Sequence, residues 1–262
     1  MKRSSGARLG ATAVVGALSL ALITGCGSES DDKKDSGSGS QAEAAKALTA
    51  AELKDLIVAQ GDVDGFKFSA VKKADFPTDK KVITGDEQCK PLAYVMSGLA
   101  PGDAAAETNT MATEEKSPTD TASKSLDELT EGELEDALGD SMNLNVTVVG
   151  LSSYDGDGAE KTFKTVSDAV AACAGGFTVG SGGEDQKFTK VAETKASGTG
   201  DESIAFAATG DMDGQPGVVH GEVVRHGNNV AAYYTMNIGA LMTGKEYDVP
   251  AKLIDAQAGK LK

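Results

Sequence analysis

The chain has no tryptophan, and its phenylalanines and tyrosines bring the aromatic content to only 5%. Because base-stacking platforms need aromatic side chains, this scarcity argues against a binder of single-stranded nucleic acid. Positive charge is also scarce, since 25 Lys and Arg face 40 Asp and Glu and leave a formal net charge of −15. Such a surface repels phosphate backbones and anionic headgroups. The expected partners are neutral molecules, cations or basic polypeptides, and no nucleic acid.

Catalytic residue types are few. Only two histidines occur, His220 within a strand-like run and His226 at a turn, so a histidine general base has to be one of these. The stretch 150–154 places Ser152 and Ser153 after a glycine but lacks the final glycine of a GxSxG nucleophile elbow. We therefore expect a non-enzymatic protein, and a hydrolase using either histidine is the minor alternative.

Two acidic loops have a partial resemblance to calcium sites. Residues 155–158 (Asp-Gly-Asp-Gly) lack an oxygen ligand at the fifth position, and residues 211–216 have proline where an EF-hand loop turns on glycine. Neither loop supplies the bidentate glutamate at position 12. We predict a helix-entry turn with Asp157 as N-cap for the first loop and a hairpin connection for the second. No metal and no cofactor are expected.

The N-terminal stretch has the parts of a secretory signal. Three basic residues within 2–8 precede an apolar run over 11–23, which ends in the small pair Thr24-Gly25 and then Cys26. The run is short against the roughly 20 residues that a transmembrane helix needs. The segment resembles the lipobox signal of bacterial lipoproteins. That resemblance implies cleavage after residue 25, lipidation of Cys26, and attachment to the extracytoplasmic face of the cell membrane.

With Cys26 lipidated, Cys89 and Cys173 remain in an oxidising compartment and predict one disulfide. The pair has no CxxC spacing and no clustered histidines, so a metal or redox role is not expected.

Composition divides the remaining chain. Residues 26–47 are rich in Ser, Gly, Asp and Lys and predict a flexible linker. Residues 48–262 predict a single α+β domain. Within it, 101–140 is rich in Ala, Thr, Ser and Glu, and we predict an acidic insertion outside the core that is mobile through Pro118 and then includes an amphipathic helix.

Periodicity predicts the elements of this domain. Thr49 and Glu52 have capping-box spacing for a helix that Gly61 can stop. Apolar residues every three or four positions predict a second helix over 159–173, with Cys173 on its core side. The other predicted elements are strands over 66–70, 143–152, 188–193, 203–209, 218–225 and 229–236, a hairpin turn at 226–228, and a last helix opened by Asp248 and Pro250. Together the later strands predict an antiparallel meander.

The order of these elements resembles the PknH-like extracellular domain, the sensor domain of a mycobacterial Ser/Thr kinase that also occurs in actinobacterial lipoproteins. The resemblance rests on the helix starting at 48–53, the half-cystine Cys89, the strand and helix over 146–173, and the strand at 228–231 before the closing helix. It implies an antiparallel sheet packed with helices and a cleft for an unidentified ligand. Members commonly have two disulfides, whereas only Cys89 and Cys173 are available here.

Three functions follow as hypotheses. The first is a lipid-anchored, sensor-like domain that binds an unknown envelope ligand or protein partner. The second is a lipid or glycolipid carrier resembling the LprG and LppX lipoproteins, although the predicted strands look short and have few large apolar residues. The third is the hydrolase described above.

Overall fold

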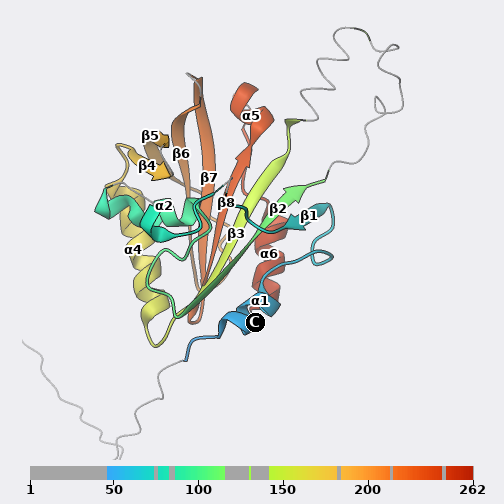
Figure 1. Cartoon of the computed structure of the whole chain (residues 1–262), viewed down its shortest axis with the longest axis vertical. Coiled ribbons are helices and arrows are strands. Elements are labelled where there is room, and N and C mark those ends of the chain that lie inside the picture. Colours follow the sequence, from blue (N-terminus) through green and yellow to red (C-terminus); the bar gives the residue numbers. More distant parts are fainter. Residues whose placement is uncertain are drawn as a thin grey trace, which may run out of the picture. The chain divides into compact units, whose positions relative to one another are not determined.

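Figure 1 shows the chain as a computed structural model. The described residues are 46–73, 76–82, 86–115, 130, 142–181, 184–212, 215–243 and 246–261. Within these ranges, eight strands form one sheet in the order β1-β2-β3-β8-β7-β6-β5-β4, and every neighbouring pair is antiparallel. The predicted α+β class with an antiparallel sheet is confirmed.

The strands are β1 (Phe66–Ser69), β2 (Ala106–Glu114), β3 (Asn145–Ser153), β4 (Phe177–Ser181), β5 (Glu184–Thr194), β6 (Glu202–Met212), β7 (Gln215–His226) and β8 (Asn229–Asn237). The helices in the described ranges are α1 (Ala50–Leu56), α2 (Lys90–Met96), α4 (Gly158–Ala172), α5 (Ile238–Thr243) and α6 (Ala251–Lys260), with short 3-10 turns at Lys80–Val82 and Glu87–Cys89.

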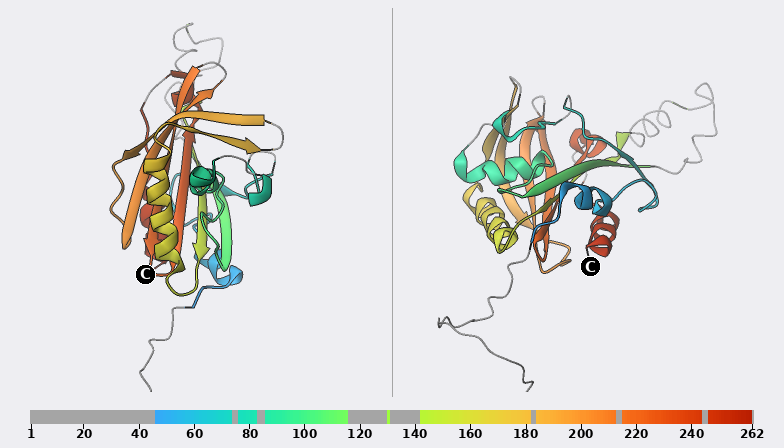
Figure 2. Two further views of the ribbon diagram at one scale, coloured as in Figure 1. Left: turned by 90° about the vertical axis from the view of Figure 1, so that its left-hand side faces the viewer. Right: turned by 60° about the horizontal axis from the view of Figure 1, so that its bottom comes forward.

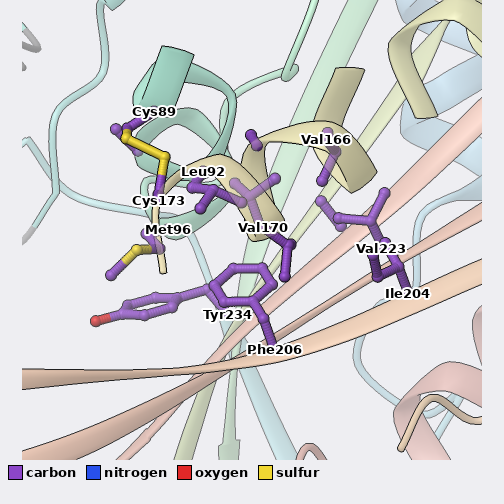
Figure 3. Close-up of a cluster of buried hydrophobic side chains, with 14 of the residues drawn as sticks. Cys89, Leu92, Met96, Val166, Val170, Cys173, Ile204, Phe206, Val223 and Tyr234 are labelled. Atoms are coloured by element: carbon purple, nitrogen blue, oxygen red, sulfur yellow. A yellow bond between two sulfur atoms is a disulfide. The ribbon is translucent and has the colours of Figure 1, made fainter. Parts of the chain in front are cut away.

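One face of the sheet packs against α2 and α4, which lie apart from α1 and α6 (Figure 2). Val166 and Val170 of α4 belong to the same buried cluster as Phe206 and Val223 of the sheet (Figure 3). This cluster holds most of the large apolar side chains of α4, as the three- and four-residue spacing predicted. We call this side of the sheet the disulfide face.

The predicted disulfide is confirmed, because Cys89 and Cys173 are bonded with their Cα atoms 5.9 Å apart. Both cysteines are 1% exposed. The bond joins the residue before α2 to the residue after α4, so it fixes the two helices of the disulfide face to each other (Figure 3).

The opposite face is covered by α1 and α6, and we call it the terminal-helix face. Leu53 of α1 and Ile254 of α6 form a second buried cluster with Val149 of β3 and Tyr233 of β8. Because strand side chains alternate between faces, Tyr233 packs in this second cluster while its chain neighbour Tyr234 packs in the cluster on the disulfide face.

The first helix begins where the sequence predicts and ends earlier. The Thr49–Glu52 capping box is present in both directions. The helix ends at Leu56 rather than near Gly61, because a tertiary contact replaces its next turn. The buried Gln257 of α6 accepts a hydrogen bond from Val58 N at 2.9 Å and donates one to Leu56 O at 3.0 Å. These bonds satisfy backbone groups at the helix end.

The predicted insertion at about 101–140 is wrong in its first part. Residues Ala106–Glu114 form β2, which pairs with β1 on one side and β3 on the other. Its small and polar residues suit an inner strand because their side chains can hydrogen-bond to neighbouring backbone carbonyls. Asn109 Nδ2 donates to Gly98 O, and Thr110 Oγ1 donates to Ser69 O. The predicted amphipathic helix falls within 125–138 and, apart from Thr130, lies outside the described residues.

The first described residues, Lys46 and Ala47, lie beside the β7–β8 hairpin. Asn228 Nδ2 donates to Lys46 O at 2.8 Å, and Ala47 N donates to Asp155 Oδ1 at 2.9 Å. The predicted turn at 226–228 is present, with Gly227 at a φ of +58° between paired His226 and Asn229. We call this the hairpin end of the sheet.

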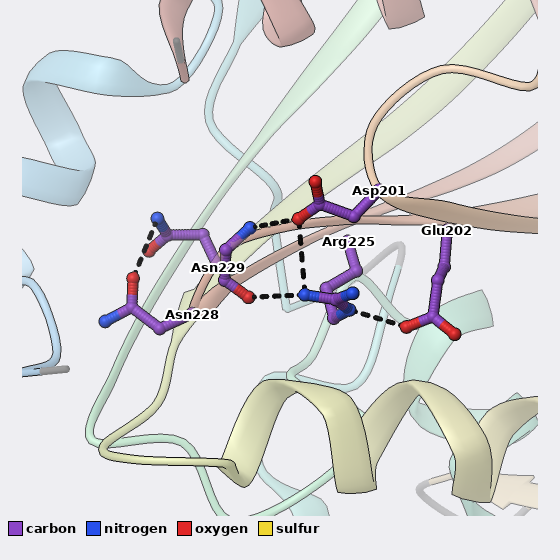
Figure 4. Close-up of polar contacts among 6 residues, drawn as sticks. Asp201, Glu202, Arg225, Asn228 and Asn229 are labelled. Carbon is purple, nitrogen blue, oxygen red and sulfur yellow. Dashed lines mark hydrogen bonds and ion pairs between the residues drawn. The ribbon is translucent and has the colours of Figure 1, made fainter. Parts of the chain in front are cut away.

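Ion pairs and a hydrogen bond stabilise the hairpin end. Arg225 pairs with Glu202 at 2.6 Å and with Asp201 at 3.2 Å, and Asp201 also accepts the Gly227 N–H (Figure 4).

Candidate ligand-binding pocket

A pocket of about 490 Å³ lies at the far end of β7 from the hairpin end. Its wall is formed by the first half of β7, by α5, and by the segment that connects α5 to α6. The described residues that line it are Pro216, Val218, His220, Ala240, Glu246, Tyr247 and Asp248.

Strand alternation explains the wall that β7 supplies. Pro216, Val218 and His220 are alternate residues, so their side chains leave the same face of the sheet. Val219 between them packs into the core on the disulfide face, which places the pocket on the terminal-helix face. The cross-strand neighbour of His220 on β6 is Ala207. Because the side chain of Ala207 is only a methyl group, it leaves space beside the His220 imidazole.

Tyr247 holds the connecting segment against the sheet. Its hydroxyl donates a hydrogen bond to Val218 O at 2.6 Å and lies 3.4 Å from Thr235 O. Its ring meets His220 edge to face, with 4.7 Å between the centroids. Burial raises the pKa of Tyr247 above its usual range, so the phenol stays protonated and its donor role is constant around neutral pH.

His220 is a half-buried titratable group on the part of the wall that β7 supplies. Burial lowers the pKa of His220, and the nearby carboxylate of Asp248 opposes that shift in part. The imidazole is therefore mainly neutral at pH 7, when one ring nitrogen donates and the other accepts. It offers a polar contact without adding positive charge to the pocket.

The charged groups of the described lining are both acidic. Glu246 and Asp248 are exposed and flank Tyr247 in sequence, and the described part of the wall contains no lysine or arginine. Neither carboxylate has an ion-pair or hydrogen-bond partner in the described part of the chain. The pocket thus combines an apolar and aromatic wall with two carboxylates that have no countercharge among the described residues.

A second hollow of about 410 Å³ runs along the solvent side of α4. Its lysines are already paired, Lys161 with Asp157 at 2.8 Å and Lys164 with Asp168 at 2.7 Å. A ligand there has to compete with these ion pairs. The pocket at the start of β7 is therefore the stronger candidate.

The residues singled out in the sequence are dispersed. Cys26 lies outside the described residues, and Cys89 and Cys173 lie on the disulfide face, away from the pocket. The two serines serve the fold. Ser152 Oγ is 3.1 Å from the Tyr154 hydroxyl and donates to Val230 O, and Ser153 Oγ accepts the Leu48 N–H.

The acidic loops also have structural roles. Asp155 accepts the Ala47 N–H. Asp157 is the N-cap residue of α4 as predicted, but its carboxylate pairs with Lys161 instead of bonding a backbone N–H. Met212 pairs with Gln215, as the predicted hairpin connection requires. Across the described ranges, no three acidic, histidine or cysteine side chains are grouped as a metal site.

Of the pocket residues, sequence reasoning found only His220, as a possible base. It missed Glu246 and Tyr247, and it assigned Asp248 only to the opening of the last helix. The usable signal is an aromatic residue between two carboxylates, in a stretch that leads to Pro250 and has no helical or strand pattern.

No family model and no curated protein matches this chain. Among solved structures, the chain is similar to the extracellular domain of PknH from Mycobacterium tuberculosis, with a TM-score of 0.47 and 11% sequence identity. The likeness covers 82% of this chain and 95% of that one. No helix in the described ranges is long and apolar enough to span a membrane.

Proposed function

We propose that this protein is a non-enzymatic, lipid-anchored domain that binds a ligand outside the cytoplasm, in the pocket at the start of β7. The observation that carries the proposal is the pocket itself, because it joins volume, an apolar wall and two carboxylates that have no ion-pair partner among the described residues. Small-molecule sites are typically concave, mostly apolar and oriented by a few polar groups.

The position of the chain's entry agrees with this role. Lys46 contacts Asn228 at the hairpin end, whereas Val218 lies seven residues before Arg225 on β7. At about 3.4 Å per strand residue, the pocket is roughly 24 Å from the hairpin end. Ala47, the last residue of the predicted linker, thus lies at the end of the sheet remote from the pocket.

The anchor is tested by fractionating cells that produce the full chain or its Cys26→Ala variant. We expect the full chain in the membrane fraction, with an N-terminal peptide whose mass includes two or three acyl chains, since a single chain binds membranes only marginally. The variant should keep the signal and lack these lipids. An unmodified Cys26 in the mature chain would refute the anchor.

Binding is tested by native mass spectrometry of the full chain and of a Val218→Arg variant. Val218 is exposed at the pocket wall, so arginine fills the pocket without disturbing the core. A small molecule that is retained by the full chain and lost from the variant agrees with the proposal. A molecule retained equally by both refutes this pocket as the site.

The mass spectrometry and an added assay of turnover separate the alternatives. Retained glycolipid or other acyl lipid would favour the carrier related to LprG and LppX. Turnover of a panel of esters and peptides that disappears in His220→Ala would favour the hydrolase.

A further inference from the structure

We infer that the pocket selects a small organic cation, whose ammonium group binds at Glu246 and Asp248 while its apolar part lies against the wall made by Val218 and Tyr247. This inference rests on the proposed function and adds the chemical class of the ligand.

The carboxylates of Glu246 and Asp248 support a cationic ligand, because neither is paired with a base in the part of the chain that the structure describes. Several acidic side chains in the described ranges have a countercharge, as Asp62 has in Lys260 at 2.6 Å and Asp168 has in Lys164 at 2.7 Å. Glu246 and Asp248 have no such partner among the described residues, although both line a cavity. A cavity wall of one charge sign concentrates ligands of the opposite sign.

The apolar wall is the second observation, and it distinguishes an organic cation from a metal ion. Calcium takes six to eight oxygen ligands, whereas this pocket presents two carboxylates beside Pro216, Val218 and Ala240. An ammonium group needs only a few acceptors, and a hydrocarbon chain attached to it buries apolar surface. The ring of Tyr247 is also an attractive surface for a cation.

His220 is the third observation. Its neutral imidazole adds no positive charge beside the two carboxylates, and Asp248 is close enough to act on the pKa of His220. The groups that face His220 are Tyr247 and Asp248 from the connecting segment, Ala207 from β6 and Thr235 from β8. No base among these neighbours opposes an incoming cation.

The test uses the full chain, purified from membranes in non-ionic detergent, and three probes with similar apolar parts: 2-phenylethylamine, 2-phenylethanol and 3-phenylpropionate. The ring protons of the chain's two histidines provide the signal in proton NMR. His220 lies in the pocket and His226 at the opposite end of β7, so the second histidine is an internal control.

We expect the amine to shift the His220 ring protons in a saturable way and to leave those of His226 unchanged. The alcohol should bind at least tenfold more weakly, and the carboxylate should produce no shift. Asp248→Asn and Glu246→Gln should each weaken amine binding about tenfold at low salt, which corresponds to about 1.4 kcal/mol. Asp168→Asn removes the same charge from α4 and should leave the affinity unchanged.

Equal binding of amine and alcohol, or affinity unchanged in both carboxylate variants, would overturn the cation inference while leaving the pocket as a binding site. A lack of any His220 shift with the amine up to 10 mM, roughly the weakest binding worth assigning, would overturn it as well. Failure of the proposed function is a different result, namely a retained ligand that Val218→Arg does not displace.

Discussion

Loss of the Cys89–Cys173 bond should lower the stability of the folded domain by about 4.5 kcal/mol. The two cysteines are separated by 84 positions. In the chain-entropy model, opening a loop of that length gives the unfolded chain about 15 cal/mol/K of entropy, or about 4.5 kcal/mol at 25 °C. For the roughly 215 residues of 48–262, an unfolding entropy near 2.1 cal/mol/K per residue converts this into a Tm lower by about 10 °C.

The assay compares two chains that both carry Cys26→Ser, one of them with Cys89→Ala and Cys173→Ala in addition. Tyrosine fluorescence during urea unfolding gives the free energy of each, and calorimetry gives the Tm. Because both cysteines are 1% exposed, the bridged chain should resist a thiol reductant without urea and become reducible across its unfolding transition. A Tm difference below about 2 °C, or reduction of the native chain at the rate of an exposed disulfide, would refute the reasoning.

Three further predictions concern the core and pH. Gly221→Ala should cost about 1 to 3 kcal/mol in urea unfolding, because the added methyl meets the Phe206 ring at 2.4 Å, while Gly175→Ala, with open space around it, should be neutral. Burial raises the pKa of Tyr233, so the unfolded chain loses the phenol proton first and the stability present below pH 10 should be lost as the pH rises. The loss should be up to about 1.4 kcal/mol per pH unit, and Tyr233→Phe should reduce this dependence of stability on pH. Burial lowers the pKa of His220, so the unfolded chain takes up protons first as the pH falls. The free energy of unfolding should therefore decrease as the pH drops below about 6.5. His220→Gln should reduce this loss, and His226→Gln is the control variant.

Elements with local signals were predictable from the sequence. The Thr49–Glu52 capping box starts α1 because both of its bonds form within one turn. The apolar stripe containing Val166 and Val170 determines which side of α4 is buried, and Cys173 lies on that side, in the core. In each case, the residues that decide the structure are close together in the chain.

Strand β2 was missed because its stability comes from its neighbours. Its sequence, Ala-Glu-Thr-Asn-Thr-Met-Ala-Thr-Glu, resembles the polar residues that follow it in composition and has few large apolar side chains. Pairing with β1 and β3 satisfies its backbone groups and covers Ala112 completely. Composition alone does not distinguish such a strand from an insertion.

The pocket was not predictable because its walls meet only through the path of the chain after β8. That strand ends at Asn237, α5 turns away over Ile238–Thr243, and the connecting segment returns Tyr247 to the carbonyl of Val218, 29 positions earlier. Nothing in the local pattern around His220 specifies an aromatic neighbour from that distance.

The site lies beside a row of small and polar side chains on the terminal-helix face of the sheet. On the terminal-helix face, the cross-strand pair Val149 and Tyr233 packs against α1 and α6. The next cross-strand pair on this face is Thr147 and Thr235, whose hydroxyl oxygens are 2.8 Å apart, and Thr235 in turn pairs with His220 of β7. The covering helices thus meet a row of large side chains, and the pocket begins over a row of small and polar ones. Since the exposed Glu246 and Asp248 are not packed in either buried cluster, their neutral variants should keep stability within about 0.5 kcal/mol of the original chain. A loss of cation binding in those variants therefore reports on charge at the pocket and not on folding.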